Sequence, residues 1–84
     1  MSKYENLIEK ILQAQSDANI HFDDVCHLLL LFGFNERIKG SHHIFRKEGV
    51  EERLNLQRDG NNVKPYQIKQ VRNILLTYNL TELL

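Results

Sequence analysis

The chain has 84 residues, of which 42% are hydrophobic and 26% charged, so its composition predicts one folded domain and excludes an intrinsically disordered protein. A domain this small has no room for a deep pocket with a large cofactor, which favours a shallow surface site or a partner interface. Basic and acidic residues balance at eleven each, yet residues 1–36 hold two basic and six acidic residues while residues 37–84 hold nine and five. One half of the chain could therefore face an anion while the other half repels it.

The single cysteine, Cys26, allows no internal disulfide, which fits a reducing compartment. The first residues contain no apolar segment of the signal-peptide type, and no stretch approaches the ~20 apolar residues of a membrane span. The sequence therefore predicts a cytoplasmic protein that does not enter a membrane.

The first predicted helix is amphipathic and ends near Gln15. Ser2 and Glu5 have the spacing of a capping box at its start. Apolar residues recur at helical spacing along it: Tyr4, Leu7, Ile8, Ile11 and Leu12. We expect residues 1–20 to form an N-terminal helical extension and residues 21–84 the functional domain, the two making one compact unit.

A second helix is predicted from Phe22 to just before Gly33, which can end it. Asp23 and Asp24 lie in its first turn, where the helix dipole favours negative charge. The run Leu28–Phe32 is apolar on every side of this helix. Either both sides of the helix are covered, or part of the run meets another protein or a second copy of the chain.

After Gly33 the apolar pattern changes from helical to alternating. It predicts strands at residues 35–39, 42–47 and 50–57, with a tight turn at Glu48-Gly49 between the last two. Residues 59–62, Asp-Gly-Asn-Asn, are expected to form a loop.

Pro65 opens the last predicted helix, where its missing N–H removes no hydrogen bond, and the helix ends near Asn79. Its apolar stripe contains Ile68, Val71, Ile74, Leu75 and Tyr78. The order of elements predicts an α+β fold, with a three-stranded antiparallel sheet, helices packed on one of its faces and an extra N-terminal helix. The other sheet face is left for solvent or a ligand.

The segment from Arg37 to Lys47 has four permanent cations, no acidic residue and the adjacent histidines His42 and His43. Gly40 lets the backbone bend, and Ser41 offers a hydroxyl and an N–H to a phosphate. RNA cleavage through a cyclic phosphate needs a base for the 2′-OH proton and a cation beside the phosphate, and histidine suits the first role near neutral pH. The alternative reading of the same pattern is a polar strand on a solvated sheet face.

The pattern around this segment closely resembles the HicA family of toxins, over about Phe22 to Tyr78. The residues that carry the resemblance are Phe32-Gly33-Phe34, Arg37, Lys39-Gly40-Ser41-His42-His43-Ile44-Phe45, and the helix opened by Pro65 with Val71-Arg72-Asn73-Ile74-Leu75. The resemblance implies a fold like that of double-stranded-RNA-binding domains. It implies the toxin of a type II toxin–antitoxin system, a ribosome-independent endoribonuclease that cleaves mRNA and stops growth. It also implies a HicB-type antitoxin that covers the active site.

The family's catalytic histidine closes the Gly-Ser-His triplet, which corresponds to His42, with His43 as the fallback. A strand places these two side chains on opposite faces, so periodicity cannot choose between them, and His42 is chosen on resemblance alone. The residues expected to contact RNA are Lys39, Gly40, Ser41, His43, Arg46 and Lys47, with Lys39, Arg46 and Lys47 holding the phosphodiester. No cofactor is implied, and catalysis is expected to be independent of metal.

Two pairs of residues, Cys26-His27 and His42-His43, could suggest a metal site, but adjacent side chains diverge on a helix or strand. We therefore expect no zinc site from this spacing, with Cys26 buried as a small apolar residue and His27 on the polar side of its helix.

Two other functions fit the sequence. A non-catalytic RNA-binding module would bind RNA on the same sheet without cleaving it, and a protein–protein adaptor would bind its partner through Leu28–Phe32. The resemblance assigns no role to residues 1–20, and the neutral overall charge lowers the RNA affinity expected from phosphate neutralisation.

Overall fold

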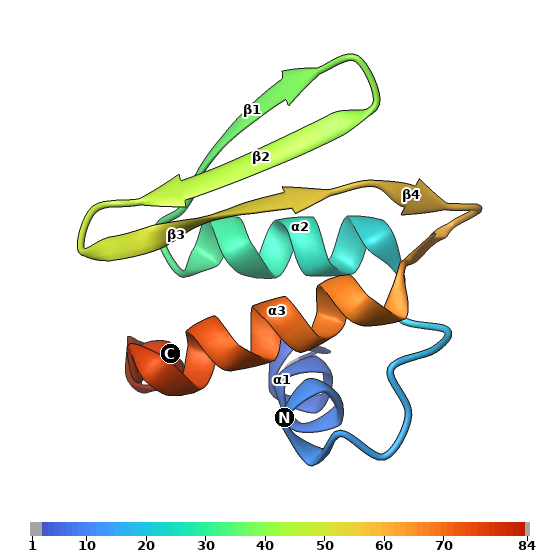
Figure 1. Cartoon of the computed structure of the whole chain (residues 1–84). Helices are drawn as coiled ribbons and strands as arrows, with labels where there is room; N and C mark the ends of the chain where they lie inside the picture. The colour runs from blue at the N-terminus through green and yellow to red at the C-terminus, as the bar shows by residue number, and fades with distance from the viewer. Residues whose placement is uncertain (1–2, 84) are drawn as a thin grey trace.

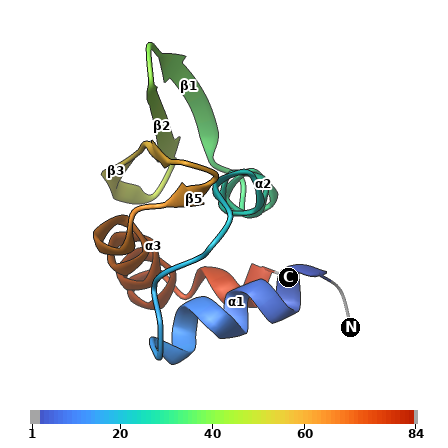
Figure 2. The ribbon, with the colours of Figure 1, turned by 90° about the vertical axis from the view of Figure 1, so that its right-hand side faces the viewer.

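The predicted α+β fold is confirmed by a computed structural model, which describes residues 3–83 (Figure 1). In chain order its elements are α1 (Lys3–Gln13), α2 (Phe22–Leu31), β1 (Asn35–Lys39), β2 (His42–Lys47), β3 (Val50–Leu56), β4 (Arg58–Asp59), β5 (Asn62–Val63), α3 (Pro65–Thr77) and a final 3₁₀ turn, η1 (Leu80–Leu83). Strands β1, β2 and β3 form an antiparallel sheet in that order. Helices α2 and α3 lie against one side of the sheet, and α1 packs on the side of these helices that is remote from the sheet (Figures 1 and 2).

Backbone geometry explains where the first two helices end. Helix α1 ends at Gln13, two residues earlier than predicted, because the next residue, Ala14, has a φ of +56° that leaves the helical region. Helix α2 ends close to Gly33, as predicted. Gly33 has a φ of +94°, a conformation that favours glycine, and the Phe34 N–H donates to the Leu29 carbonyl at 3.1 Å to close the last turn. The proposed cap at Ser2 lies outside the described residues.

The register of the sheet places Lys39 directly opposite His42. On the other side of β2, Ile44 is opposite Asn55. A bulge interrupts β3 before Leu54, because the pairing shifts between Phe45 and Lys47 of β2. It leaves residues 51–53 exposed and keeps Leu54 and Leu56 on the helix side of the sheet.

The loop predicted at residues 59–62 is instead a small hairpin of the two-residue strands β4 and β5, so that prediction is wrong. Gly60 forms the turn with a φ of +63°. The hairpin pairs with the segment before α2, because the Val63 N–H donates to the Ile20 carbonyl at 2.8 Å and the Phe22 N–H donates to the Asn61 carbonyl at 2.9 Å. These bonds attach the start of α2 to the segment that leads into α3.

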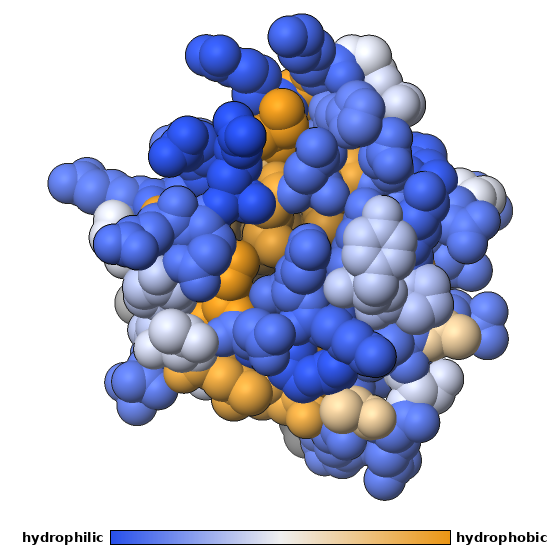
Figure 3. Space-filling view, viewed as in Figure 1, coloured by the Kyte–Doolittle hydropathy of each residue, from blue (hydrophilic) through white to orange (hydrophobic). Residues whose placement is uncertain are grey.

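The hydrophobic core lies between the sheet and the helices. Its most buried large side chains are Phe22, Phe32, Phe45, Ile11, Ile20, Leu28, Leu29, Leu54, Leu56, Ile68 and Leu75. The apolar run at the end of α2 divides between two environments, because Leu28, Leu29 and Phe32 are buried while Leu30 and Leu31 are 44% and 51% exposed. Polar side chains cover most of the face seen in Figure 3, with apolar surface between them.

Within residues 3–83, the helices are too short and too polar for any to cross a membrane.

Candidate active site and nucleic-acid interface

Four cationic side chains gather on the sheet face that is turned away from α2 and α3. They line one shallow depression around Ile44, and we call Arg37, Lys39, Arg46 and Arg53 the basic sheet face. The strand period of two brings them together, since Arg37 pairs with Ile44 across β1 and β2 and Lys39 pairs with His42. Cations at this density favour an anionic ligand that extends along the sheet.

His42 lies at one end of the basic sheet face with its ring exposed to solvent. Its Nδ1 is 3.0 Å from the amide oxygen Oδ1 of Asn55, an acceptor, so Nδ1 carries the proton and donates it in the neutral ring. Its Nε2 is 3.4 Å from Nε2 of Gln57, an amide donor, so in this tautomer the Nε2 lone pair of His42 accepts a long hydrogen bond from Gln57. The two amides thus hold the imidazole in the tautomer that a general base requires.

The turn between β1 and β2 consists of Gly40 and Ser41. Gly40 has a φ of +60°, and its Cα faces open space, with no atom within 4 Å of the position that a Cβ would occupy. A ligand can therefore approach the backbone closely at this position. The hydroxyl of Ser41 accepts a long hydrogen bond of 3.4 Å from Nε2 of Gln57, the same amide that meets His42.

His43 points to the helix side of the sheet. Its Nδ1 is 2.8 Å from Oε2 of Glu36, and its ring meets the edge of the Phe22 ring with 4.8 Å between centroids. Only 18% of its side chain is exposed. The carboxylate of Glu36 and the ring of Phe22 together set the orientation of this ring.

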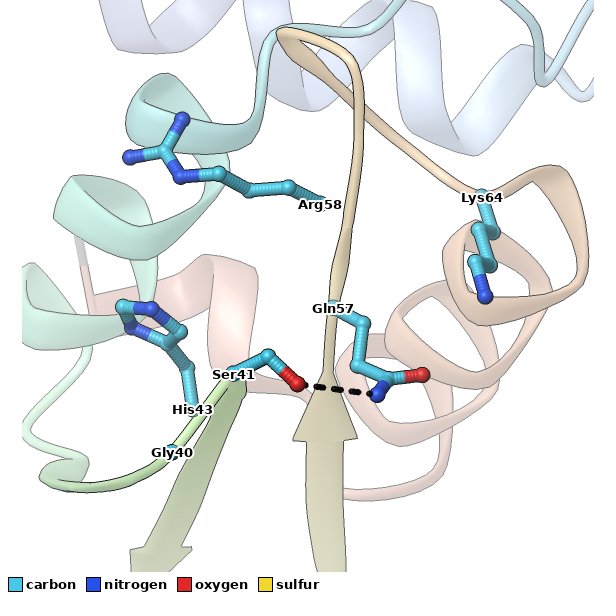
Figure 4. Close-up of a pocket in the computed structure, with 6 residues that line it drawn as sticks. All are labelled: Gly40, Ser41, His43, Gln57, Arg58 and Lys64. Atoms are coloured by element: carbon cyan, nitrogen blue, oxygen red, sulfur yellow. Dashed lines mark hydrogen bonds between the residues drawn. The ribbon is translucent and has the colours of Figure 1, made fainter.

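A pocket of about 330 Å³ opens beside the turn, and we call it the turn pocket. It is lined by Gly40, Ser41, His43, Gln57, Arg58 and Lys64 (Figure 4). Arg58 is held in place by an ion pair of 2.6 Å with Asp23 and by its position 4.5 Å from the centre of the Phe22 ring. The pocket therefore combines the side chains of Arg58 and Lys64 with hydroxyl and amide groups, which are the groups that recognise phosphate.

Residues 22–76 match a family model described as "HicA toxin of bacterial toxin-antitoxin". No curated protein and no solved structure matches the chain. The chain belongs to the HicA toxin family. Membership makes it the toxin of a toxin–antitoxin pair and implies an antitoxin as its partner.

The match extends from the first residue of α2 almost to the end of α3, so the basic sheet face and the turn pocket both lie inside the HicA region. Helix α1 lies outside it. The resemblance to the HicA family that the Gly-Ser-His pattern indicated is thus confirmed. Gly40, Ser41 and His42, which form this pattern, lie on the β1–β2 hairpin.

The structure separates the expected RNA-contacting residues of this HicA chain into two groups. Lys39 and Arg46 lie on the basic sheet face with His42, while Gly40, Ser41 and His43 line the turn pocket. Lys47 belongs to neither group. Like His43 and Phe45, it points to the helix side of the sheet, where its Nζ lies beside Gly33, 2.8 Å from the position that a Cβ on that glycine would occupy.

Several residues of these two surfaces were not identified from the sequence as site residues: Arg37, Arg53, Asn55, Gln57, Arg58, Lys64 and Glu36. The period of two along the third predicted strand puts Arg53, Asn55 and Gln57 on one face. The register with β2, which brings them to His42, follows from the turn and the bulge and is not visible in the alternation.

Cys26 is buried as predicted, and His27, its neighbour on α2, is exposed. Burial raises the pKa of the Cys26 thiol to about 12, and the negative charges of Glu36 and Asp23 contribute to this rise. The thiol is therefore protonated near neutral pH and is a poor nucleophile.

Proposed function

We propose that this HicA chain is an endoribonuclease that cleaves mRNA, with His42 as the proton-transfer group and without a metal in the reaction. The observation that carries the proposal is the exposed ring of His42 at the end of the basic sheet face, held by Asn55 through Nδ1. Its Nε2 makes only a long contact of 3.4 Å with Gln57, which a substrate hydroxyl can replace. A buried or unoriented ring at this position would not support the same chemistry.

In the proposed reaction, Nε2 of His42 removes the proton from a ribose 2′-OH. The resulting oxygen attacks the adjacent phosphorus, a cyclic phosphate forms, and the bond to the 5′-oxygen of the next nucleotide breaks. The leaving oxygen receives a proton from the imidazolium or from water. Lys39, which is directly opposite His42 across the strands, stabilises the additional negative charge on the phosphate in the transition state.

Substrate binding uses both surfaces around the hairpin turn. Arg37, Arg46 and Arg53 lie along the sheet at positions suited to successive phosphates of one strand. Gly40, Ser41 and His43, with Arg58 and Lys64, form a second anion site beside the turn. We leave Lys47 out of the phosphodiester site because it points to the opposite face of β2 from Lys39 and Arg46.

The proposed partner is a HicB-type antitoxin that covers the basic sheet face and His42 and so blocks the RNA. The proposed location of the pair is the cytoplasm, where mRNA is accessible and where a reduced Cys26 is expected.

The test is expression of wild type, His42→Ala and His27→Ala without antitoxin, followed by cleavage assays on the purified proteins with a chelator present. Removal of a general base should lower cleavage by roughly 10²–10⁴-fold and restore growth. His27→Ala is the matched control, since His27 is an exposed histidine on α2 that lines neither the basic sheet face nor the turn pocket, and it should behave as wild type.

Equal cleavage by folded His42→Ala and by wild type would reject the catalytic assignment. Tight, salt-sensitive RNA binding by wild type without any cleavage would favour the second candidate, an RNA-binding module on the same basic sheet face.

A further inference from the structure

Three side chains from different elements converge behind the hairpin, on the helix side of the sheet. They are Cys26 of α2, Glu36 of β1 and His43 of β2. The Sγ atom, a carboxylate oxygen and a ring nitrogen all lie within 4.8 Å of one another. These residues are ten and seven positions apart in the chain, so the usual spacing of metal ligands in sequence does not reveal them.

Thiolate, imidazole and carboxylate are the three ligand types that Zn²⁺ takes in proteins, with bonds of about 2.0–2.3 Å. Tetrahedral geometry at those bond lengths separates the ligand atoms by roughly 3.3–3.8 Å. Closing the observed triangle therefore requires movements on the order of 1 Å. The hydrogen bond of 2.8 Å between Glu36 and His43 already brings two of the three groups closer than that separation.

The surroundings of the triangle favour a cation. Burial is the main cause of the raised pKa of the Cys26 thiol, and the negative charges of Glu36 and Asp23 add to the rise, so negative potential also reaches the sulfur. Arg58 opposes them, but its charge and that of Asp23 offset each other in an ion pair of 2.6 Å, which leaves Glu36 as the acidic group that adds negative potential beside the thiol. A divalent ion would neutralise this potential and stabilise the thiolate.

The site is accessible from solvent although its thiol is buried. The side chains of Glu36 and His43 are 21% and 18% exposed, and His43 also lines the turn pocket. A hydrated ion can reach the triangle through that pocket and keep one water molecule as a fourth ligand.

We propose that Cys26, Glu36 and His43 bind one Zn²⁺ ion, with a water molecule from the turn pocket completing a tetrahedral site. Binding replaces the hydrogen bond between Glu36 and His43 with two metal bonds. The ring proton of His43 moves from Nδ1 to Nε2 through solvent so that the Nδ1 lone pair can bind the ion, and the Cys26 thiol releases its proton to solvent as the Zn–S bond forms. The ion links α2 to both strands of the β1–β2 hairpin. It does not use His42, whose ring is on the other face, but it shares His43 with the anion site proposed beside the turn. The proposal goes beyond the nuclease, and its test does not depend on RNA cleavage.

The test is a titration of the purified full chain with Zn²⁺ in competition with a chromophoric chelator, after removal of metal. We expect saturation at one ion per chain, weakened at least tenfold in Cys26→Ser, Glu36→Gln and His43→Gln. His27→Gln is the matched control, because it removes an exposed histidine adjacent in sequence to Cys26, and it should bind as wild type. Zn²⁺ should raise the Tm of wild type and of His27→Gln but not that of Cys26→Ser.

Co²⁺ is a second probe because its spectrum reports the ligands directly. Wild type should show the intense visible absorption of a tetrahedral ion and a thiolate charge-transfer band, and the latter should vanish in Cys26→Ser. Circular dichroism establishes that each variant is folded. If Cys26→Ser does not fold, the loss of metal affinity in Glu36→Gln, at a partly exposed position, takes its place in the titration.

Three results would overturn the proposal: no saturable binding at one ion per chain, undiminished binding by folded Cys26→Ser or Glu36→Gln, or equal weakening by His27→Gln and His43→Gln. The last would indicate adventitious binding to surface histidines. None of these results bears on RNA cleavage, which is measured separately with a chelator present.

Discussion

At the scale of single residues, two neighbouring histidines have opposite surroundings. His42 is exposed and contacts the amides of Asn55 and Gln57, whereas His43 is mostly buried between Glu36 and Phe22. The strand period of two predicts that they point to opposite faces. It cannot say which face the helices cover, because Ile44 and Phe45 are both apolar and either could have faced the core.

Cys26 gives a prediction about stability at high pH. Its pKa is raised from the ordinary value of 9.0 to about 12 in the folded state, chiefly by burial. Between these two values the unfolded chain releases the thiol proton while the folded chain keeps it, so rising pH favours unfolding. The free energy of unfolding should therefore fall by up to about 1.4 kcal/mol per pH unit from this group, and its contribution is fully present below pH 9.0.

The measurement is urea unfolding of wild type and Cys26→Ala at a series of pH values from neutral to alkaline, with a chelator present. Tyrosine and lysine groups also titrate in this range, so the informative quantity is the difference between the two proteins. That difference should shrink steadily above pH 9.0, as the advantage of the wild-type thiol is lost. Parallel curves would show that the thiol ionises as easily in the folded chain as in the unfolded one.

At the scale of the elements, periodicity predicted the helices α2 and α3 and the strands β2 and β3 because each contains several regularly spaced apolar residues. Strand β1 has only one apolar residue, Ile38, and was predicted from the change of pattern after Gly33. It missed β4 and β5, since two-residue strands are too short to alternate and their Asp-Gly-Asn-Asn composition is typical of loops. The basic sheet face was foreseen only in part. Lys39 and Arg46 were predicted as RNA contacts from the single cationic segment Arg37–Lys47. Arg53 lies beside them only because β2 pairs with β3, which the sequence pattern does not show.

The basic sheet face gives a prediction about RNA affinity. Arg37→Glu combined with Arg53→Glu, in the His42→Ala background so that RNA survives, should weaken binding of single-stranded RNA at least tenfold. Each lost phosphate contact should also reduce the slope of log K against log salt by about 0.7. The measurement is fluorescence anisotropy over a series of salt concentrations.

The control for that experiment has the same change in net charge on another surface. Lys10→Glu with Lys69→Glu alters exposed residues of α1 and α3, on the helix side of the molecule. It should keep most of the affinity and nearly all of the salt slope. If both double variants lose affinity equally, RNA responds to overall charge and the sheet face has no special role.

At the scale of the whole molecule, α1 lies outside the HicA match but is joined to the rest by buried contacts. Ile11 and Ile20 are 0% and 1% exposed and belong to the same core as the sheet and α3. Arg72 of α3 donates to both carboxylate oxygens of Asp17, at 2.8 and 3.0 Å, and to the carbonyl of Ile11 at 3.1 Å. These contacts suggest that residues 1–20 and 21–84 unfold together.

A variant at Asp17 tests that cooperation, because Arg72 and Asp17 have side chains only 12% and 11% exposed. Asp17→Ala leaves a nearly buried guanidinium with a single backbone acceptor from α1, and it should lower the free energy of unfolding by about 3 kcal/mol. Glu48→Ala, at an exposed turn between β2 and β3, should change it by no more than about 0.5 kcal/mol. Calorimetry should show one transition for all three proteins, with calorimetric and van't Hoff enthalpies that agree. A second transition in wild type would mean that α1 is attached to the HicA domain without sharing its stability, and so would a loss of unfolding free energy in Asp17→Ala no larger than in Glu48→Ala. A single transition, with the larger loss in Asp17→Ala, would mean that the N-terminal extension is part of the same hydrophobic core as the HicA domain.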